Sequence, residues 1–144
     1  MAILSTWLPW ALLSAIFAAL TAIFAKIGLD GIDSDYATLI RTFVIVLTLG
    51  TLVYATGKWR NPWEIPGKSG TFLVLSALAT GASWLCYFRA LKLGDASRVA
   101  PVDKLSVVLV ALFAVLFLGE HLTPREWMGI ALVGGGVLLL GLPR

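Results

Sequence analysis

Four charged residues lie inside stretches that are otherwise almost wholly apolar: Arg41, Arg89, Asp103 and Lys104. A charge inside a membrane-spanning helix costs at least about 2.5 kcal/mol, so such residues usually contact a substrate, an ion or one another. Asp103 and Lys104 are adjacent and follow Pro101 closely. A carboxylate and an ammonium group at this place can contact a polar substrate or carry a proton, and we predict that these two residues do so.

Each of these charges also has a structural interpretation. Arg41 lies roughly two turns into its apolar stretch, where it either faces a water-filled cavity or extends to the lipid head groups. Arg89 lies nearer a helix end, which favours the head groups. If a helix begins near Pro101, Asp103 and Lys104 lie at the membrane surface. Because neighbours on a helix point about 100° apart, we expect each of these two to need its own partner or water.

Two aromatic residues, Trp84 and Tyr87, lie well inside a predicted helix or one turn from its end. All the other tryptophans and tyrosines lie at or near predicted helix ends, where aromatic belts form at the lipid–water interface. We therefore predict that Trp84 and Tyr87 line a cavity, where they could hold a ring or an organic cation. With Asp103, Lys104 and Arg41 they make up the predicted substrate-binding set.

Motifs for other kinds of chemistry are missing from the sequence. A single cysteine, Cys86, excludes an internal disulfide and a multi-cysteine metal site, and there is no HExxH helix or serine nucleophile motif. The net charge is only +3, and no stretch rich in lysine and arginine is present. We therefore expect no enzymatic activity, metal ion or cofactor, and no nucleic-acid partner.

The composition indicates that the elements holding these residues are membrane helices. Hydrophobic residues make up 59% of the 144 residues and charged residues 13%, against about 25% charged residues in soluble domains. A chain this small cannot hide so much apolar surface in its interior, whereas lipid accepts it. Spanning the hydrocarbon takes about 20 apolar residues. Five stretches qualify, giving an all-α integral membrane protein with helices over residues 7–27, 36–56, 69–91, 96–118 and 124–142.

The last of these helices has the clearest local signals. Thr123 can cap its start, with Pro124 in the first helical position and Glu126 completing a capping box, and Pro143 would stop it. The helix is rich in glycine. Its small residues Ala131 and Gly135 are four apart, a spacing that lets helix backbones approach closely in lipid.

The second half of the chain carries several short motifs in a fixed order. These are A-L-x-x-G-D-A-S over residues 90–97, L-G-E over 118–120, W-M-G-I over 127–130 and G-G-V-L-L over 135–139 in the glycine-rich last helix. In order and spacing the chain resembles the EamA domain of the drug/metabolite transporter superfamily. Most members carry two such repeats, and this chain resembles the short single-repeat proteins of bacteria and archaea. The resemblance implies a carrier or exporter of small metabolites or drug-like molecules in the bacterial inner membrane or the archaeal plasma membrane. It also implies a cavity lined mainly by the first four helices, with the fifth chiefly a packing element.

A single five-helix repeat raises a question of assembly. Two inverted repeats usually build one transporter, so a half-length chain could rebuild that arrangement as an antiparallel homodimer. Lysine and arginine residues of the links are equally divided between the two predicted sides, so their distribution sets no strong orientation. We hypothesise dual topology. The alternative function is a non-transporting membrane scaffold or a subunit of a flippase for a lipid-linked sugar.

Overall fold

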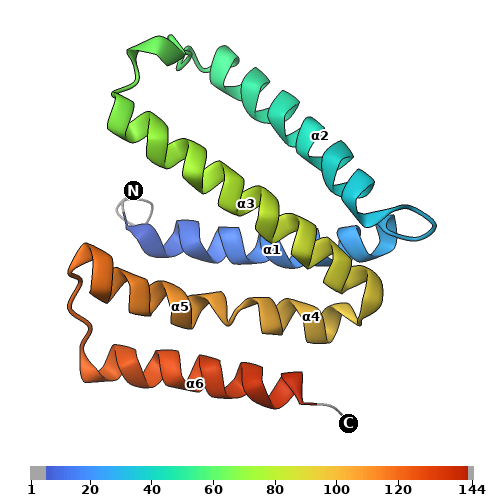
Figure 1. Cartoon of the computed structure of the whole chain (residues 1–144), viewed down its shortest axis with the longest axis vertical. Coiled ribbons are helices and arrows are strands. Elements are labelled where there is room, and N and C mark those ends of the chain that lie inside the picture. The colour runs from blue at the N-terminus through green and yellow to red at the C-terminus, as the bar shows by residue number, and fades with distance from the viewer. Residues whose placement is uncertain (1–5, 143–144) are drawn as a thin grey trace. The chain divides into compact units, whose positions relative to one another are not determined.

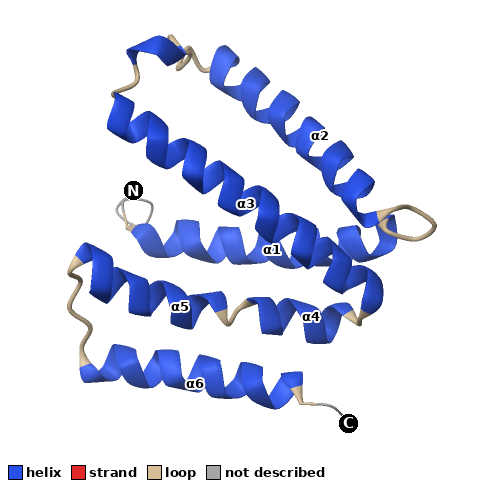
Figure 2. Cartoon of the chain, in the orientation of Figure 1, coloured by secondary structure: helices blue, strands red, loops and turns tan. Residues whose placement is uncertain are grey.

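A computed structural model describes residues 6–142, and every regular element in that range is helical (Figures 1 and 2). The α-helices are α1 (Trp7–Gly28), α2 (Ser34–Ala55), α3 (Gly67–Leu93), α4 (Ala96–Asp103), α5 (Ser106–Phe113) and α6 (Pro124–Gly141). A 3₁₀ turn, Pro62–Glu64, lies between α2 and α3, and a π-helical segment, Ala114–Leu118, follows α5. The prediction of an all-α chain is confirmed for residues 6–142.

Four of the helical segments are long and apolar enough to cross a membrane. They are α1, α2, α3 and the combined stretch Ala96–Leu118, with 22, 22, 27 and 23 residues. Helix α6 has 18 residues, and two of the residues in its first turn are charged. It is not among these four segments. A fifth membrane crossing therefore stays a prediction. Pro143, the predicted stop of the last helix, lies outside the described residues.

The threonines of α2 satisfy their hydroxyl groups within the helix, which makes the helix compatible with a lipid environment. Four hydroxyls within α2 and that of its C-cap residue Thr56 each donate to the backbone carbonyl four residues earlier, at 2.7–2.8 Å: Thr38 to Ser34, Thr42 to Thr38, Thr48 to Val44, Thr51 to Leu47 and Thr56 to Leu52. Hydrocarbon offers no water to a polar group, so a hydroxyl there must find its partner within the protein. Bonded in this way, the threonines add no unsatisfied donor to the surface of the helix.

Residues 24–92 form one compact unit, built from the end of α1, α2 and α3. Helices α2 and α3 run antiparallel (Figure 1). Asp33 caps the start of α2, because its Oδ1 accepts from the backbone N–H groups of Asp35 at 2.9 Å and Tyr36 at 3.1 Å. At the other end, Asn61 caps the 3₁₀ turn between the two helices through the N–H of Trp63.

Three cations connect the end of α3 with the end of α1, the start of α2 and the turn between them. Arg89 pairs with Asp35 through Nε–Oδ1 at 2.9 Å and Nη2–Oδ2 at 2.5 Å. Lys92 Nζ donates to the carbonyl of Ile32 at 2.7 Å, and Lys26 Nζ donates to the carbonyl of Leu91 at 2.6 Å. We expected Arg89 to extend to the head groups. It has a protein partner instead, because the antiparallel arrangement of α2 and α3 places Asp35, at the start of α2, beside the end of α3.

Residues 6–23 and 93–142 form the other unit, in which α6 packs along α4 and α5 (Figure 1). The face of α6 in contact with these helices holds Gly134 and Gly141. A Cβ added to Gly134 would lie 3.1 Å from Val108 Cγ2, and one added to Gly141 would lie 3.7 Å from Val102 Cγ2. The expected pair, Ala131 and Gly135, is exposed in this chain. The glycines that allow the close approach of α6 are thus seven residues apart. Seven residues make about two helical turns, so Gly134 and Gly141 lie on the same face of α6.

The predicted helix over residues 96–118 is interrupted. Helix α4 begins at Ala96 and continues through Pro101, so it does not begin near that proline. The break follows at residues 104–105, where N–H groups bond three residues back: Lys104 to Pro101 at 2.9 Å and Leu105 to Val102 at 3.0 Å. This is the tighter 3₁₀ pattern. The π-helical segment ends at Leu118 and is capped by Gly119, whose φ of 69° lies in the left-handed region that glycine adopts without strain.

The start of α6 confirms the predicted capping box. Thr123 Oγ1 accepts from the backbone N–H of Glu126, and Glu126 Oε2 accepts from the backbone N–H of Thr123 at 2.7 Å. Pro124 takes the first helical position, where no backbone donor is needed.

Candidate functional site

The best-defined site is a cation held on aromatic rings between α2 and α3. The guanidinium carbon of Arg41 lies 4.2 Å from the centroid of the Trp84 ring and 5.3 Å from that of Phe88. A guanidinium within about 6 Å of a ring centroid is attracted by the negative face of the ring. Trp84 and Phe88 are four residues apart on α3, so both rings lie on one side of that helix. We call Arg41, Trp84 and Phe88 the arginine–aromatic cluster.

Phe88 is the member of the cluster that the sequence reasoning missed. Its side chain is buried, at 3% exposure, whereas Trp84 and Tyr87 are half-buried. The spacing in the sequence could have indicated Phe88, because it follows Trp84 by about one helical turn and so lies on the same side of the helix. Tyr87 packs against Phe88, with ring centroids 6.4 Å apart and planes at 61°. Because Arg41 lies over the Trp84 ring, one face of that ring is occupied by a cation of the chain itself.

Arg41 differs from Arg89 in its bonding. Its Nη1 atom is buried and has no hydrogen-bond partner among the described residues. Helix α2 contains one carboxylate, Asp35, and both of its oxygens are engaged by Arg89. Helix α3 contains no carboxylate. The two helices thus hold one neutralised arginine, Arg89, at the end where it meets Asp35, and a second arginine, Arg41, that rests on aromatic rings.

Asp103 and Lys104 lie in the other unit, at the end of α4. Lys104 Nζ is 3.2 Å from Asp103 Oδ2, and the two side chains are 53% and 36% exposed. We expected each to need its own partner, and the structure pairs them with each other. Lys104 is the C-cap residue at the helix break, where its long flexible side chain can reach back to the preceding residue.

The predicted site residues are therefore divided between the two compact units. Arg41, Trp84 and Tyr87 belong to residues 24–92, whereas Asp103 and Lys104 belong to the unit that holds residues 93–142. Within residues 6–142 there is no cluster of histidine, cysteine and carboxylate side chains able to hold a metal ion.

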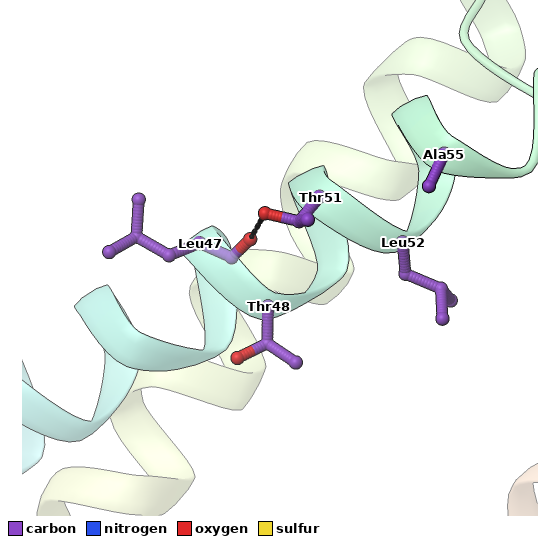
Figure 3. Close-up of a pocket in the computed structure, with 5 residues that line it drawn as sticks. All are labelled: Leu47, Thr48, Thr51, Leu52 and Ala55. Carbon is purple, nitrogen blue, oxygen red and sulfur yellow. Dashed lines mark hydrogen bonds between the residues drawn. The ribbon is translucent and has the colours of Figure 1, made fainter.

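A shallow depression also lies on α2, further along the helix than Arg41. Figure 3 shows its lining, which comes from one helix: Leu47, Thr48, Thr51, Leu52 and Ala55. The hydroxyl of Thr51 points back along the helix and donates to the carbonyl of Leu47 at 2.8 Å, as the dashed line in Figure 3 marks. Thr48 bonds in the same way to Val44. The depression therefore presents mainly apolar surface, which suits an acyl chain or a neighbouring helix better than a polar ligand.

Comparison with known proteins bears on what this arrangement does. The sequence matches the EamA-like transporter family over residues 5–142. The chain belongs to this family. A Sinorhizobium protein described as an uncharacterized transporter in the cobO 3′ region is 63% identical over 137 residues, covering 95% of this chain and 97% of the relative. Family membership and the apolar helices together show a multi-pass cell-membrane protein.

Two further relatives share less of their sequence with this chain. An uncharacterized protein of Methanocaldococcus jannaschii is 29% identical over 131 residues, covering 91% of this chain and 93% of its own length. A Yersinia pestis protein described as the probable 4-amino-4-deoxy-L-arabinose-phosphoundecaprenol flippase subunit ArnE is 35% identical over 69 residues. That match covers 48% of this chain and 60% of the relative. No solved structure matches the chain significantly.

Proposed function

We propose that this EamA protein is a secondary carrier of small metabolites or drug-like molecules, without enzymatic activity. The observation that supports this most directly is Arg41, which lies inside a helix able to span the membrane and has no carboxylate partner on α2 or α3. A charge so placed is costly in lipid and is usually retained for a substrate or ion pathway. The family match supports a transport role in general.

The substrate-binding residues in this proposal are Arg41, Trp84 and Tyr87 on one unit and Asp103 and Lys104 on the other. Asp103 and Lys104 lie where α4 gives way to α5. Interrupted helices supply unbonded backbone groups and charges near the binding sites of many carriers. In the proposal, Asp103 contacts the substrate or carries the coupled proton.

The proposed assembly is a homodimer of five-helix repeats, with α6 as the fifth crossing. An inverted pair of such repeats gives the pseudo-two-fold arrangement of many carriers. A reporter tag at the C-terminus tests the orientation. Equal accessibility from both membrane faces supports an antiparallel dimer, and accessibility from one face alone contradicts it.

Transport itself is tested with purified protein in proteoliposomes. A thermal-shift screen of metabolites first selects compounds that stabilise the folded protein, since a ligand that binds only the folded state raises its melting temperature. Uptake of these compounds is then compared with protein-free liposomes and with the Asp103→Asn variant. Uptake that requires the protein and falls in D103N supports the proposal. A screen in which no stabilising compound is taken up contradicts the carrier function, and full uptake by a normally inserted D103N removes Asp103 from the site.

A second candidate function is a subunit of a flippase for a lipid-linked sugar. The ArnE match favours it, although that match covers about half of this chain. Such a subunit would copurify with a second membrane protein and would move a polyprenyl-phosphate sugar only in that partner's presence. Transport by the purified chain alone distinguishes the carrier from the subunit.

A further inference from the structure

We propose that the arginine–aromatic cluster is an oxyanion-binding site, and that the molecule it accepts carries a carboxylate or a phosphate group. The proposal deepens the carrier function and rests on it for the step of transport, but binding can be tested without transport. Arg41 supplies the charge, and the rings of Trp84 and Phe88 contact its guanidinium.

The first argument concerns charge balance along α2 and α3. Besides Lys68 and Lys92 near the two ends of α3, these two helices contain two arginines, Arg41 and Arg89, and one carboxylate, Asp35. Both carboxylate oxygens of Asp35 accept hydrogen bonds from Arg89. Arg41 therefore retains an uncompensated positive charge within these helices, and burial of an unpaired charge is strongly unfavourable. An oxyanion that arrives from outside the unit would remove this imbalance.

The second argument concerns the geometry of the guanidinium. An arginine has five N–H donors around a flat group, and it recognises carboxylates and phosphates through paired donors along one edge. The contacts with the rings of Trp84 and Phe88 supply no oxygen acceptor, so they do not satisfy the N–H donors of this group. One of these donors, on Nη1, is buried and unbonded. A rigid, partly desolvated guanidinium of this kind is preorganised for a planar or tetrahedral oxyanion.

The third argument concerns depth along the helix. At a rise of about 1.5 Å per residue, Arg41 lies about 10 Å along α2 from its first residue, Ser34. That is about one third of a hydrocarbon layer of about 30 Å if α2 begins at the interface. Asp35 and Arg89, nearer the end, already neutralise each other. The arginine that lacks a carboxylate partner, and can therefore bind an anion, is the deeper one, Arg41.

The same arrangement argues against an organic cation at Trp84. A cation bound to an aromatic cage needs a free ring face. At 4.2 Å the Arg41 guanidinium covers one face of this ring, and its charge repels a second cation. The cluster thus favours anions over the cationic substrates that Trp84 and Tyr87 alone would suggest.

The test measures binding of a matched set of small aromatic probes to the full chain in detergent micelles by isothermal titration. Phenyl phosphate and benzoate carry the oxyanion, phenol and benzamide are the neutral counterparts, and benzylammonium is the cation. The expected result is binding of an anionic probe at least about tenfold tighter than that of its neutral counterpart. Equal binding of anionic and neutral probes, or tighter binding of the cation, overturns the proposal.

Variants connect the preference to Arg41. Arg41→Gln should lose the anion preference, about tenfold or more in affinity, and Arg41→Lys should retain part of it. Arg60→Gln, an exposed change in the link before α3, should bind like the parent chain. Trp84→Leu keeps the charge but removes the platform, so it remains informative if R41Q does not fold, and it should weaken anion binding. Unchanged anion binding in R41Q or in W84L overturns the proposal.

Two sources of oxyanion are separated by native mass spectrometry of the chain purified with phosphatidylglycerol. A lipid retained by the parent chain, lost in R41Q and displaced by phenyl phosphate assigns the site to a lipid phosphate. A lipid-free chain that binds phenyl phosphate assigns it to soluble anions. Probe binding by a chain that takes up none of the compounds selected by the thermal-shift screen would preserve this inference while contradicting the carrier function.

Discussion

The packing of α6 predicts that two neighbouring glycines differ sharply in their tolerance of a methyl group. A Cβ at Gly134 would meet Val108 Cγ2 at 3.1 Å, whereas a Cβ at Gly135 would have nothing within 4 Å. Ordinary van der Waals contact begins near 3.4 Å, so in Gly134→Ala the valine must move by a few tenths of an ångström. Gly135→Ala has the same backbone and the same chemical change without the contact, which makes it the matched control.

The magnitude follows from two opposing effects. Replacing glycine with alanine inside a helix gains up to about 1 kcal/mol of helix propensity, and this gain is shared by both variants. Overpacking a close contact costs about 1–3 kcal/mol, and the shallow overlap at Gly134 places the cost near the lower end. We therefore expect the unfolding free energy of G134A to be about 1 kcal/mol lower than that of G135A. Gly134→Leu should lower the unfolding free energy further.

The assay is reversible unfolding of the chain in mixed micelles, followed by circular dichroism, with the oligomeric state measured in parallel by light scattering. The light-scattering control matters because Gly135 is exposed. A change there could alter association between copies without altering the fold of one copy. Equal stability of G134A and G135A, or a greater loss in Gly135→Leu than in Gly134→Leu with the oligomeric state unchanged, would refute the packing of α6 against α5.

Three further predictions concern local structure. Thr123→Ala removes the hydroxyl of the capping box and should destabilise the start of α6 by about 0.5–2 kcal/mol, seen as faster hydrogen exchange in its first turn; unchanged exchange there would contradict the cap. Gly119→Ala places a side chain at φ 69° and should cost about 1–2 kcal/mol in unfolding free energy; Gly129→Ala, with negative φ and open space, is the control and should cost nothing. Asp35→Asn leaves Arg89 without its carboxylate, so hydrogen exchange should quicken in the segment between α1 and α2; slower or equal exchange would show that the ion pair does not hold that segment.

Several features could be predicted from the sequence because their causes are local. Long apolar stretches with few charges belong in lipid whatever their neighbours are, so the membrane class followed directly. The capping box at Thr123 and Glu126 depends only on residues three apart, and the structure contains it. The starts and ends of α1, α2 and α3 lie within two residues of the predicted bounds for the same reason.

Charge partners could not be predicted, because they depend on which helix ends meet. Arg89 and Asp35 are 54 positions apart in sequence and are joined only once α2 and α3 lie antiparallel. The meeting of Arg41 with Trp84 and Phe88 has the same origin. Apolar composition shows that a helix enters lipid, but every side of such a helix is apolar, so composition does not show which side meets another helix.

The sequence by itself determined that this chain is helical, lies in a membrane and carries charges at unusual positions. The tertiary structure decided that Gly134 and Gly141, rather than Ala131 and Gly135, face α4 and α5. It also decided that of the two arginines on α2 and α3, one is neutralised and the other rests on aromatic rings. The physical reason is range: helix formation and insertion into lipid are governed by neighbouring residues, whereas a buried charge is satisfied only by groups that folding brings to it.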